Sequence, residues 1–286
     1  WSSDVCSSDL ELLGFSNKSG NSKITKSWPS IQMPLDFLRD MIQGVSATKE
    51  VEMIVLELLL RAGGGGTSSG NNQKKLPFHR LERYLNAAEQ LVLYFALVRP
   101  TAREKMVKLF PLLETIEAEE VSDGGTVPSG KLNMLNEDES SAMYTALANN
   151  SLGSNAAGKR LSLALLKRLN LSVMLKQEGV NGGDAIATDA YLEPILPNKA
   201  TKKAWGDVWP NKADRDISAP KLGNLCLVSK KALSKEMKVS FPEKKSRYAS
   251  EIWPLTAKLG ERDVWDDVAI KDNSAMMVEL IKSIWG

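Results

Sequence analysis

YLEPILPNKATKKAW, residues 191–205, marks the place where the sequence changes from helical to extended character. Its first half places aromatic and branched apolar residues in short runs that end at prolines, which is typical of strands rather than helices. A second run of this kind is LGNLCLV, residues 222–228. We therefore predict one strand within 185–197 and another at 222–228, and we place a domain boundary near 184–187.

The sequence before this boundary is predicted to be helical, because apolar residues recur there with the spacing of one helix face. Pro34 stands early in the first segment, and Pro111 is expected to kink or split the fourth. Ser46 or Thr48 is positioned to cap the second. The predicted helical segments are 34–42, 48–62, 77–98, 101–116, 139–150 and 158–175, with polar or glycine-rich loops at 63–75 and 121–137.

After the two predicted strands the sequence returns to helical patterns. Residues 229–253 are basic and mainly helical by pattern, and residues 264–285 place apolar side chains on one helical stripe. The chain is thus predicted to be α+β and predominantly helical, with a helical region at 11–184 and a second domain at 185–286.

Residues 1–10, WSSDVCSSDL, resemble the in-frame translation of a sequencing adapter. Such a segment is not part of the natural protein, so we exclude it from the fold. The natural N-terminus is then expected to lie outside this sequence.

The composition favours an intracellular protein without a membrane segment. The longest apolar run, LVLYFALV at 91–98, is far shorter than the roughly 18 residues that a membrane helix needs. Cys226 is the single cysteine outside the N-terminal ten residues, so an intramolecular disulfide is not expected. A cytoplasmic protein is predicted, and a nuclear one fits as well.

Positive charge is concentrated in one block of the sequence. Residues 199–262 hold 15 basic and 7 acidic residues, a net charge of +8, whereas residues 11–198 hold 20 and 21. Such a block favours a polyanionic partner, because neutralising phosphates releases their bound counterions. A solvated lysine-rich surface is the alternative and, on composition alone, the more common case.

The ordered motifs of residues 190–286 resemble those of one nuclease family. LEPILPN is followed by Trp205 and Trp209, then by KLGNLCLVSKKALSKEMKVSFPEKKSRY and by a terminal helix that contains tryptophan. In order and spacing the segment is similar to the C-terminal domain of GmrSD-type restriction endonucleases, which target modified DNA and belong to the His-Me finger (HNH-like) nucleases. The resemblance implies a small ββα-metal domain packed with C-terminal helices. It also implies a nucleotide-hydrolysing domain that would lie N-terminal to this sequence.

The same resemblance implies a chemistry and the residues for it. A histidine at the end of the first strand takes a proton from water, and a divalent metal, usually Mg²⁺, stabilises the charge on the phosphate. Pro194 occupies the histidine position and cannot accept a proton. Glu193 is the candidate metal ligand, and Leu233 occupies the position of the family's asparagine ligand. Pro220 and Asn273 replace a histidine and an arginine that the family carries.

Framework positions of the family pattern are retained. Among them, Asn224 is expected to fix the loop after the first strand. The retained positions are Pro197, Gly223, Asn224, Phe241 and Lys244. The residues expected to contact DNA phosphates are Lys230, Lys231, Lys235, Lys244, Lys245 and Arg247.

Other reactive or aromatic residues are expected to be structural. Cys226 lies between leucines in a predicted strand with no histidine nearby, so it is interpreted as a strand residue rather than a nucleophile. Trp205 and Trp209 are expected to pack in the core, with stacking on a flipped base as the alternative. His79 is interpreted as a helix residue rather than a base.

Retained framework residues beside substituted catalytic positions predict a DNA endonuclease-family protein of the restriction and defence class with impaired or lost catalysis. The alternative is a catalytically inactive DNA-binding or protein-interaction module on the same fold. A third hypothesis is a helical scaffold whose C-terminal domain only packs against it. This hypothesis does not explain the basic block.

Overall fold

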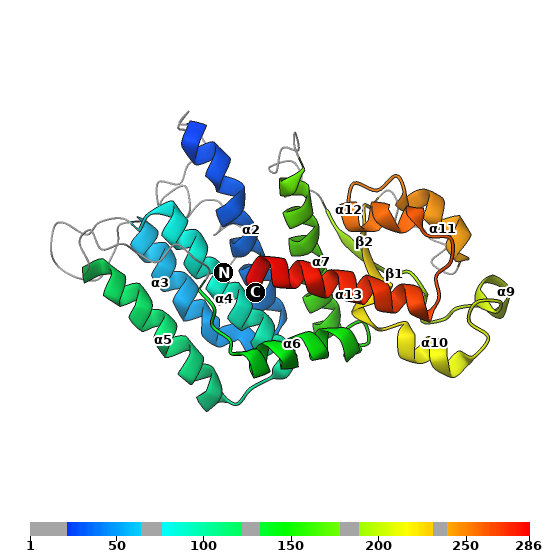
Figure 1. Ribbon diagram of the computed structural model, residues 1–286, viewed down its shortest axis with the longest axis horizontal. Helices are drawn as coiled ribbons and strands as arrows, with labels where there is room; N and C mark the ends of the chain where they lie inside the picture. The colour runs from blue at the N-terminus through cyan, green and yellow to red at the C-terminus, as the bar shows by residue number, and fades with distance from the viewer. Residues whose placement is uncertain (1–21, 64–75, 122–131, 178–188, 231–238) are drawn as a thin grey trace. The chain divides into compact units, whose positions relative to one another are not determined.

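The computed structural model describes residues 22–63, 76–121, 132–177, 189–230 and 239–286, and these form two compact units (Figure 1). The first unit contains the described residues up to Asn136, apart from 43–45, together with Trp285. The second contains Glu137–Ile284 with residues 43–45 and Gly286. The candidate site lies wholly within the second unit.

The first unit is built from helices, as predicted. Its centre is α4, in which every residue from Ala87 to Leu97 is buried. The predicted loops 63–75 and 121–137 lie mostly outside the described residues. The elements are α2 (Ser22–Gly44), the 3₁₀ helix η1 (Ser46–Val51), α3 (Glu52–Gly63), α4 (Phe78–Val98) and α5 (Ala102–Val121).

The beginning of this unit differs from the sequence prediction in two ways. Helix α2 begins at Ser22, so Pro34 is an interior residue of a longer helix rather than an early residue of a short one. The predicted helix 48–62 is divided between η1 and α3. The buried Thr48 hydroxyl donates a hydrogen bond to the Met41 carbonyl at 3.0 Å.

Helix α5 continues through Pro111, so of the two predicted effects the split is wrong and the kink stays a prediction. Proline removes one backbone donor from the helix, but the helix buries Leu112 and Ile116 beyond that point. Its start is fixed by reciprocal capping, in which the Thr101 N–H donates to Glu104 Oε2 at 2.7 Å and the Glu104 N–H donates to Thr101 Oγ1 at 3.3 Å.

The second unit combines helices with one antiparallel sheet of two strands, so the chain is an α-rich α+β protein. Strands β1 (Tyr191–Pro194) and β2 (Leu225–Val228) pair with Glu193 opposite Cys226. The surrounding elements are α6 (Glu137–Asn149), α7 (Ala156–Lys176), α9 (Lys202–Trp205), α10 (Lys212–Ser218), η2 (Leu222–Asn224), α11 (Phe241–Tyr248), α12 (Pro254–Ala257), η3 (Lys258–Glu261) and α13 (Asp267–Trp285).

An aromatic core covers one face of this sheet. Cys226 and Val228 of β2 join Trp205, Phe241 and Trp265 in one buried cluster. The rings of Phe241 and Trp265 stack with their centroids 5.5 Å apart. Because large aromatic side chains bury much apolar area, this cluster is the main anchor of α9, α11 and α13 on the sheet.

Helices α6 and α7 belong to the second unit, although the sequence prediction placed them in the region 11–184. Helix α7 packs against both strands. A buried amide also joins α7 to α12, since Asn170 Oδ1 accepts a hydrogen bond from the Leu255 N–H at 2.9 Å. The units therefore divide after Asn136, and the predicted boundary at 184–187 lies outside the described residues.

The elements around the sheet are shorter than their sequence patterns. The predicted strand 222–228 begins with the 3₁₀ helix η2 and becomes extended only at Leu225. Of the basic stretch 229–253, the described helix α11 covers only Phe241–Tyr248. Helix α13 begins at Asp267. In the described ranges, none of the helices has the length and apolar character that crossing a membrane requires.

Candidate functional site

The candidate site lies at the end of β1, where the resemblance places a histidine. Glu193 and Pro194 are the last two residues of this strand, and strand alternation directs their side chains to opposite faces of the sheet. Glu193 pairs with Cys226 and shares its face with the aromatic core. The Glu193 side chain is only 1% exposed, which is rare for a carboxylate and requires partners.

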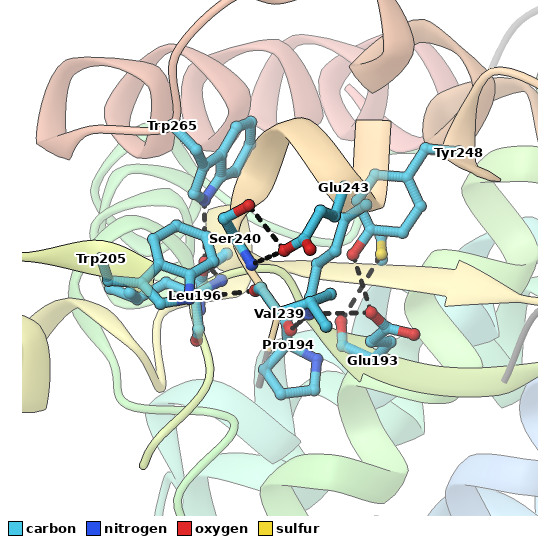
Figure 2. Close-up of polar contacts among 12 residues, drawn as sticks. Glu193, Pro194, Leu196, Trp205, Val239, Ser240, Glu243, Tyr248 and Trp265 are labelled. Atoms are coloured by element: carbon cyan, nitrogen blue, oxygen red, sulfur yellow. Dashed lines mark hydrogen bonds and ion pairs between the residues drawn. The ribbon is translucent and has the colours of Figure 1, made fainter. Parts of the chain in front are cut away.

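Two residues of α11 hold the Glu193 carboxylate (Figure 2). Lys244 and Tyr248 are four residues apart, so they project from the same face of the helix. Lys244 Nζ lies 2.8 Å from Glu193 Oε1, and the Tyr248 hydroxyl donates to the same oxygen at 2.8 Å. Lys244 also donates to the Pro194 carbonyl at 2.9 Å. These contacts tie the end of β1 to α11.

The opposite charges of Lys244 and Glu193 stabilise each other inside the protein. Lys244 is fully buried, and an isolated charge there would be strongly unfavourable without the opposite charge of Glu193. Burial raises the pKa of Tyr248 well above its usual value, so its hydroxyl remains protonated and continues to donate to the carboxylate.

Cys226 lies beside this cluster and is chemically protected. Its Sγ is 3.6 Å from the Glu193 carbonyl oxygen. Burial, with a further contribution from the charge of Glu193, raises the pKa of the Cys226 thiol. Nucleophilic cysteines need a lowered pKa and access to solvent, so Cys226 is a small strand residue, as the sequence indicated.

Asn224 connects the loop after β1 to the turn before β2. Its Oδ1 accepts hydrogen bonds from the Leu196 N–H at 2.8 Å and from Trp265 Nε1 at 2.9 Å. Its Nδ2 donates to the carbonyls of Leu196 and Ala219, both at 2.8 Å. The fully buried amide thus has all its partners and fixes the backbone that follows Pro194.

Gly223, in the turn before β2, lies in close contact with α13. A Cβ atom at Gly223 would overlap the Ser274 side chain and the Ile270 carbonyl, so a glycine is required there. Asn273, where the resemblance implies an arginine, is buried and donates from Nδ2 to the Gly223 carbonyl at 2.7 Å. The Pro220 carbonyl accepts from the Gly153 N–H at 2.7 Å. Both substituted positions therefore have structural contacts.

The described residues around Glu193 supply too few ligands for a divalent metal. Pro194 offers no ionisable side chain, and no three His, Cys, Asp or Glu side chains in the described ranges could together hold a metal ion. Glu193 Oε2 is buried without a hydrogen-bond partner in the described structure. However, Mg²⁺ prefers six oxygen ligands, and the Lys244 ammonium already lies against this carboxylate. Leu233 lies outside the described residues.

The basic residues predicted to contact DNA lie in different environments. Lys244 is in the interior, which corrects this position from a surface contact to a buried ion pair. Lys245 Nζ lies 2.9 Å from Asp263 Oδ1. Lys230 is exposed and Arg247 is partly buried. Outside the described residues lie Lys231 and Lys235.

Sequence reasoning missed two polar residues that shape this region. Tyr248 holds Glu193, and its position four residues after the retained Lys244 was the available signal. Glu251 accepts hydrogen bonds from the Ser229 N–H at 3.1 Å and from the Ser229 hydroxyl at 3.3 Å, which fixes the chain after β2. No short-range sequence pattern indicates that second contact.

Comparison with known proteins gives one match. The family model described as GmrSD restriction endonucleases, C-terminal domain, matches residues 139–280. The match begins inside α6 and ends inside α13, so it coincides with the second compact unit more closely than with the predicted domain 185–286. No curated protein and no solved structure matches the chain.

Proposed function

Through residues 139–280 the chain belongs to the GmrSD restriction endonuclease C-terminal domain family, and from this premise we propose that it binds DNA and hydrolyses it poorly or not at all. The family suggests a restriction-type nuclease with DNA as its substrate. Loss of catalysis and retention of DNA binding are the parts that we propose.

The Glu193 cluster is the observation that carries the proposal. The carboxylate nearest to the substituted base position is buried and held by Lys244 and Tyr248. A general base must accept a proton near the reacting water, and Pro194 has no group that does so. The absence of a base at Pro194 and the ion pair of Glu193 with Lys244 together support the proposed loss of metal-assisted hydrolysis.

The arrangement of β1, β2 and α11 supports a His-Me finger as the fold of this domain. Two antiparallel strands pair, and a helix packs on the face that carries Glu193. In this proposal Asn224 and Lys244 preserve the finger while Pro194 and Leu233 remove its chemistry. Any divalent metal would then be dispensable for DNA binding.

A metal-dependent nuclease is the second candidate, and one atom favours it. Glu193 Oε2 has no hydrogen-bond partner in the described structure, and it lies beside the strand end where chemistry would occur. A metal that bound this oxygen with water ligands and with groups outside the described residues would give the domain a different site.

Plasmid nicking by the full chain with Mg²⁺ or Mn²⁺ tests the proposal. We expect supercoiled plasmid to remain intact with the parent and to be nicked by the double variant Pro194→His, Leu233→Asn. The matched control is Pro194→Ala, Leu233→Ala, which alters the same positions without adding a base or a ligand. Circular dichroism and thermal melting verify that all proteins are folded.

The opposite result has a clear signature. Nicking by the parent that stops with a chelator and persists in Pro194→Ala, Leu233→Ala would overturn the loss of catalysis. Loss of that nicking in folded Glu193→Gln would then support the second candidate.

A further inference from the structure

Three lysines lie close together in the segment that follows β1. Lys199, Lys202 and Lys203 lie within the segment 194–206, which contains no aspartate or glutamate. All three side chains are exposed, and within the described part of the chain none of their ammonium groups lies within ion-pair distance of a carboxylate. We call these three residues the α9 lysine patch.

The backbone that carries this patch is held firmly. The Ala200 N–H donates to the Pro197 carbonyl at 3.1 Å, and Thr201 caps α9 by accepting from the Ala204 N–H at 3.3 Å. Trp205 ends the helix in the aromatic core, and its Nε1 donates to the Val239 carbonyl at 3.1 Å. The lysines therefore project from a fixed platform, which lies beyond the end of β1 in Figure 1.

Three other exposed lysines of the second unit differ from the patch because each is paired with an acid. Lys271 Nζ lies 2.6 Å from Asp267 Oδ2, and Lys282 Nζ lies 2.7 Å from Glu279 Oε1. Lys212 pairs with Asp216 in the same way. An ordinary solvated lysine surface has this character, with opposite charges three or four residues apart.

We infer that the α9 lysine patch binds the phosphate backbone of duplex DNA, and this inference rests on the proposed DNA-binding function. Three like charges on a short segment repel one another, and a polyanion relieves that repulsion while releasing its own counterions. The patch follows directly on the strand end that corresponds to the family's catalytic position. A DNA strand held by these lysines therefore passes the end of β1.

The experiment measures fluorescence anisotropy of a labelled duplex oligonucleotide with the full chain across a KCl series. The test variant is Lys199→Ala, Lys202→Ala, Lys203→Ala. The matched control is Lys212→Ala, Lys271→Ala, Lys282→Ala, which removes the same three positive charges from acid-paired positions. A third protein with arginine at 199, 202 and 203 keeps the charge of the patch.

The expected result is a change in salt dependence that only the patch variant shows. Each phosphate contact contributes about 0.9 to the slope of log affinity against log salt, so the slope should fall by about 2.7 in the patch variant. The control triple variant should keep most of the parent slope, and the arginine variant should keep all of it.

Three outcomes overturn the inference. An equal loss in both alanine variants would assign binding to net charge rather than to this patch. An unchanged slope in the patch variant, with steep binding by the parent, would reject the patch but leave the proposed DNA binding intact. Absence of parent binding at any salt concentration would reject both.

Discussion

Lys244 and the three lysines of the α9 lysine patch lie near the end of β1 but differ in burial and in partners. Lys244 lies beneath the strand, fully buried, with Glu193 Oε1 and the Pro194 carbonyl as partners. The α9 lysine patch lies just after the strand, exposed and without ion pairs in the described ranges. A lysine that is buried and paired stabilises the fold, whereas an exposed lysine without an ion pair is available to bind a ligand. The number of lysines in the sequence does not distinguish these cases.

The largest expected effect comes from removing the buried cation. Lys244→Met should lower the free energy of unfolding by about 3–5 kcal/mol, because Glu193 would remain as a buried carboxylate without its counter-charge. The neighbouring Lys245→Met is the matched control. Lys245 pairs with Asp263, which is 93% exposed, so its loss should cost at most about 1 kcal/mol. Urea unfolding measures both.

A double replacement separates the ion pair from its surroundings. Glu193→Leu, Lys244→Met removes both charges and should be more stable than Lys244→Met alone, since no unpaired charge stays buried. If Lys244→Met and Lys245→Met unfold at the same urea concentration, the contrast between buried and exposed lysines is wrong.

A smaller effect is expected when the second partner of Glu193 is removed. Tyr248→Phe deletes the hydroxyl that donates to Glu193 Oε1 at 2.8 Å, and hydrogen bonds to charged groups contribute about 1.5–3 kcal/mol. Tyr191→Phe, in β1, is the control, because Tyr191 is partly buried and its hydroxyl has no hydrogen bond within the described residues. Equal unfolding midpoints for the two variants would contradict a supporting role for Tyr248.

Much of the architecture follows from local sequence patterns. The helical periodicity of α4 and the short apolar runs of β1 and β2 are local signals, and these elements form close to their predicted positions. The start of α2 and the division of 48–62 did not follow, because Pro34 is tolerated inside a longer helix and a 3₁₀ helix precedes α3, and local propensity specifies neither.

The candidate site shows where local reasoning stops. The substitution at Pro194 is visible in the sequence alone, and the hydrogen bonds of Asn224 are those of a residue that fixes the loop after β1. The partners of Lys244 were not predictable, because Glu193 is 51 residues away in the chain (244 − 193 = 51) and only the tertiary fold brings them together. A basic residue in a basic block therefore predicts a surface contact, which is wrong for Lys244.

Alkaline pH should weaken the buried cluster by a measurable amount. Burial raises the pKa values of Cys226 and Tyr248, so both groups stay protonated in the folded protein while they ionise in the unfolded chain above about pH 9–10. The unfolded state then binds fewer protons, and stability falls as pH rises, by about 1.4 kcal/mol per pH unit for each group. Cys226→Ala should reduce this slope between pH 9 and 10 in urea titrations, and an unchanged slope would argue against a buried thiol.

The smallest expected effect on stability belongs to the α9 lysine patch. Replacing Lys199, Lys202 and Lys203 by alanine removes exposed side chains without ion pairs in the described structure, so each change should alter the free energy of unfolding by at most about 0.5 kcal/mol. Loss of mutual repulsion even favours a slight gain. Urea unfolding at low salt measures this, and a large destabilisation would mean that these lysines have partners in the fold and are not reserved for a ligand. We expect the patch variant to keep its stability and to lose salt dependence of DNA binding. We expect the Lys244 variant to lose stability and to keep that salt dependence.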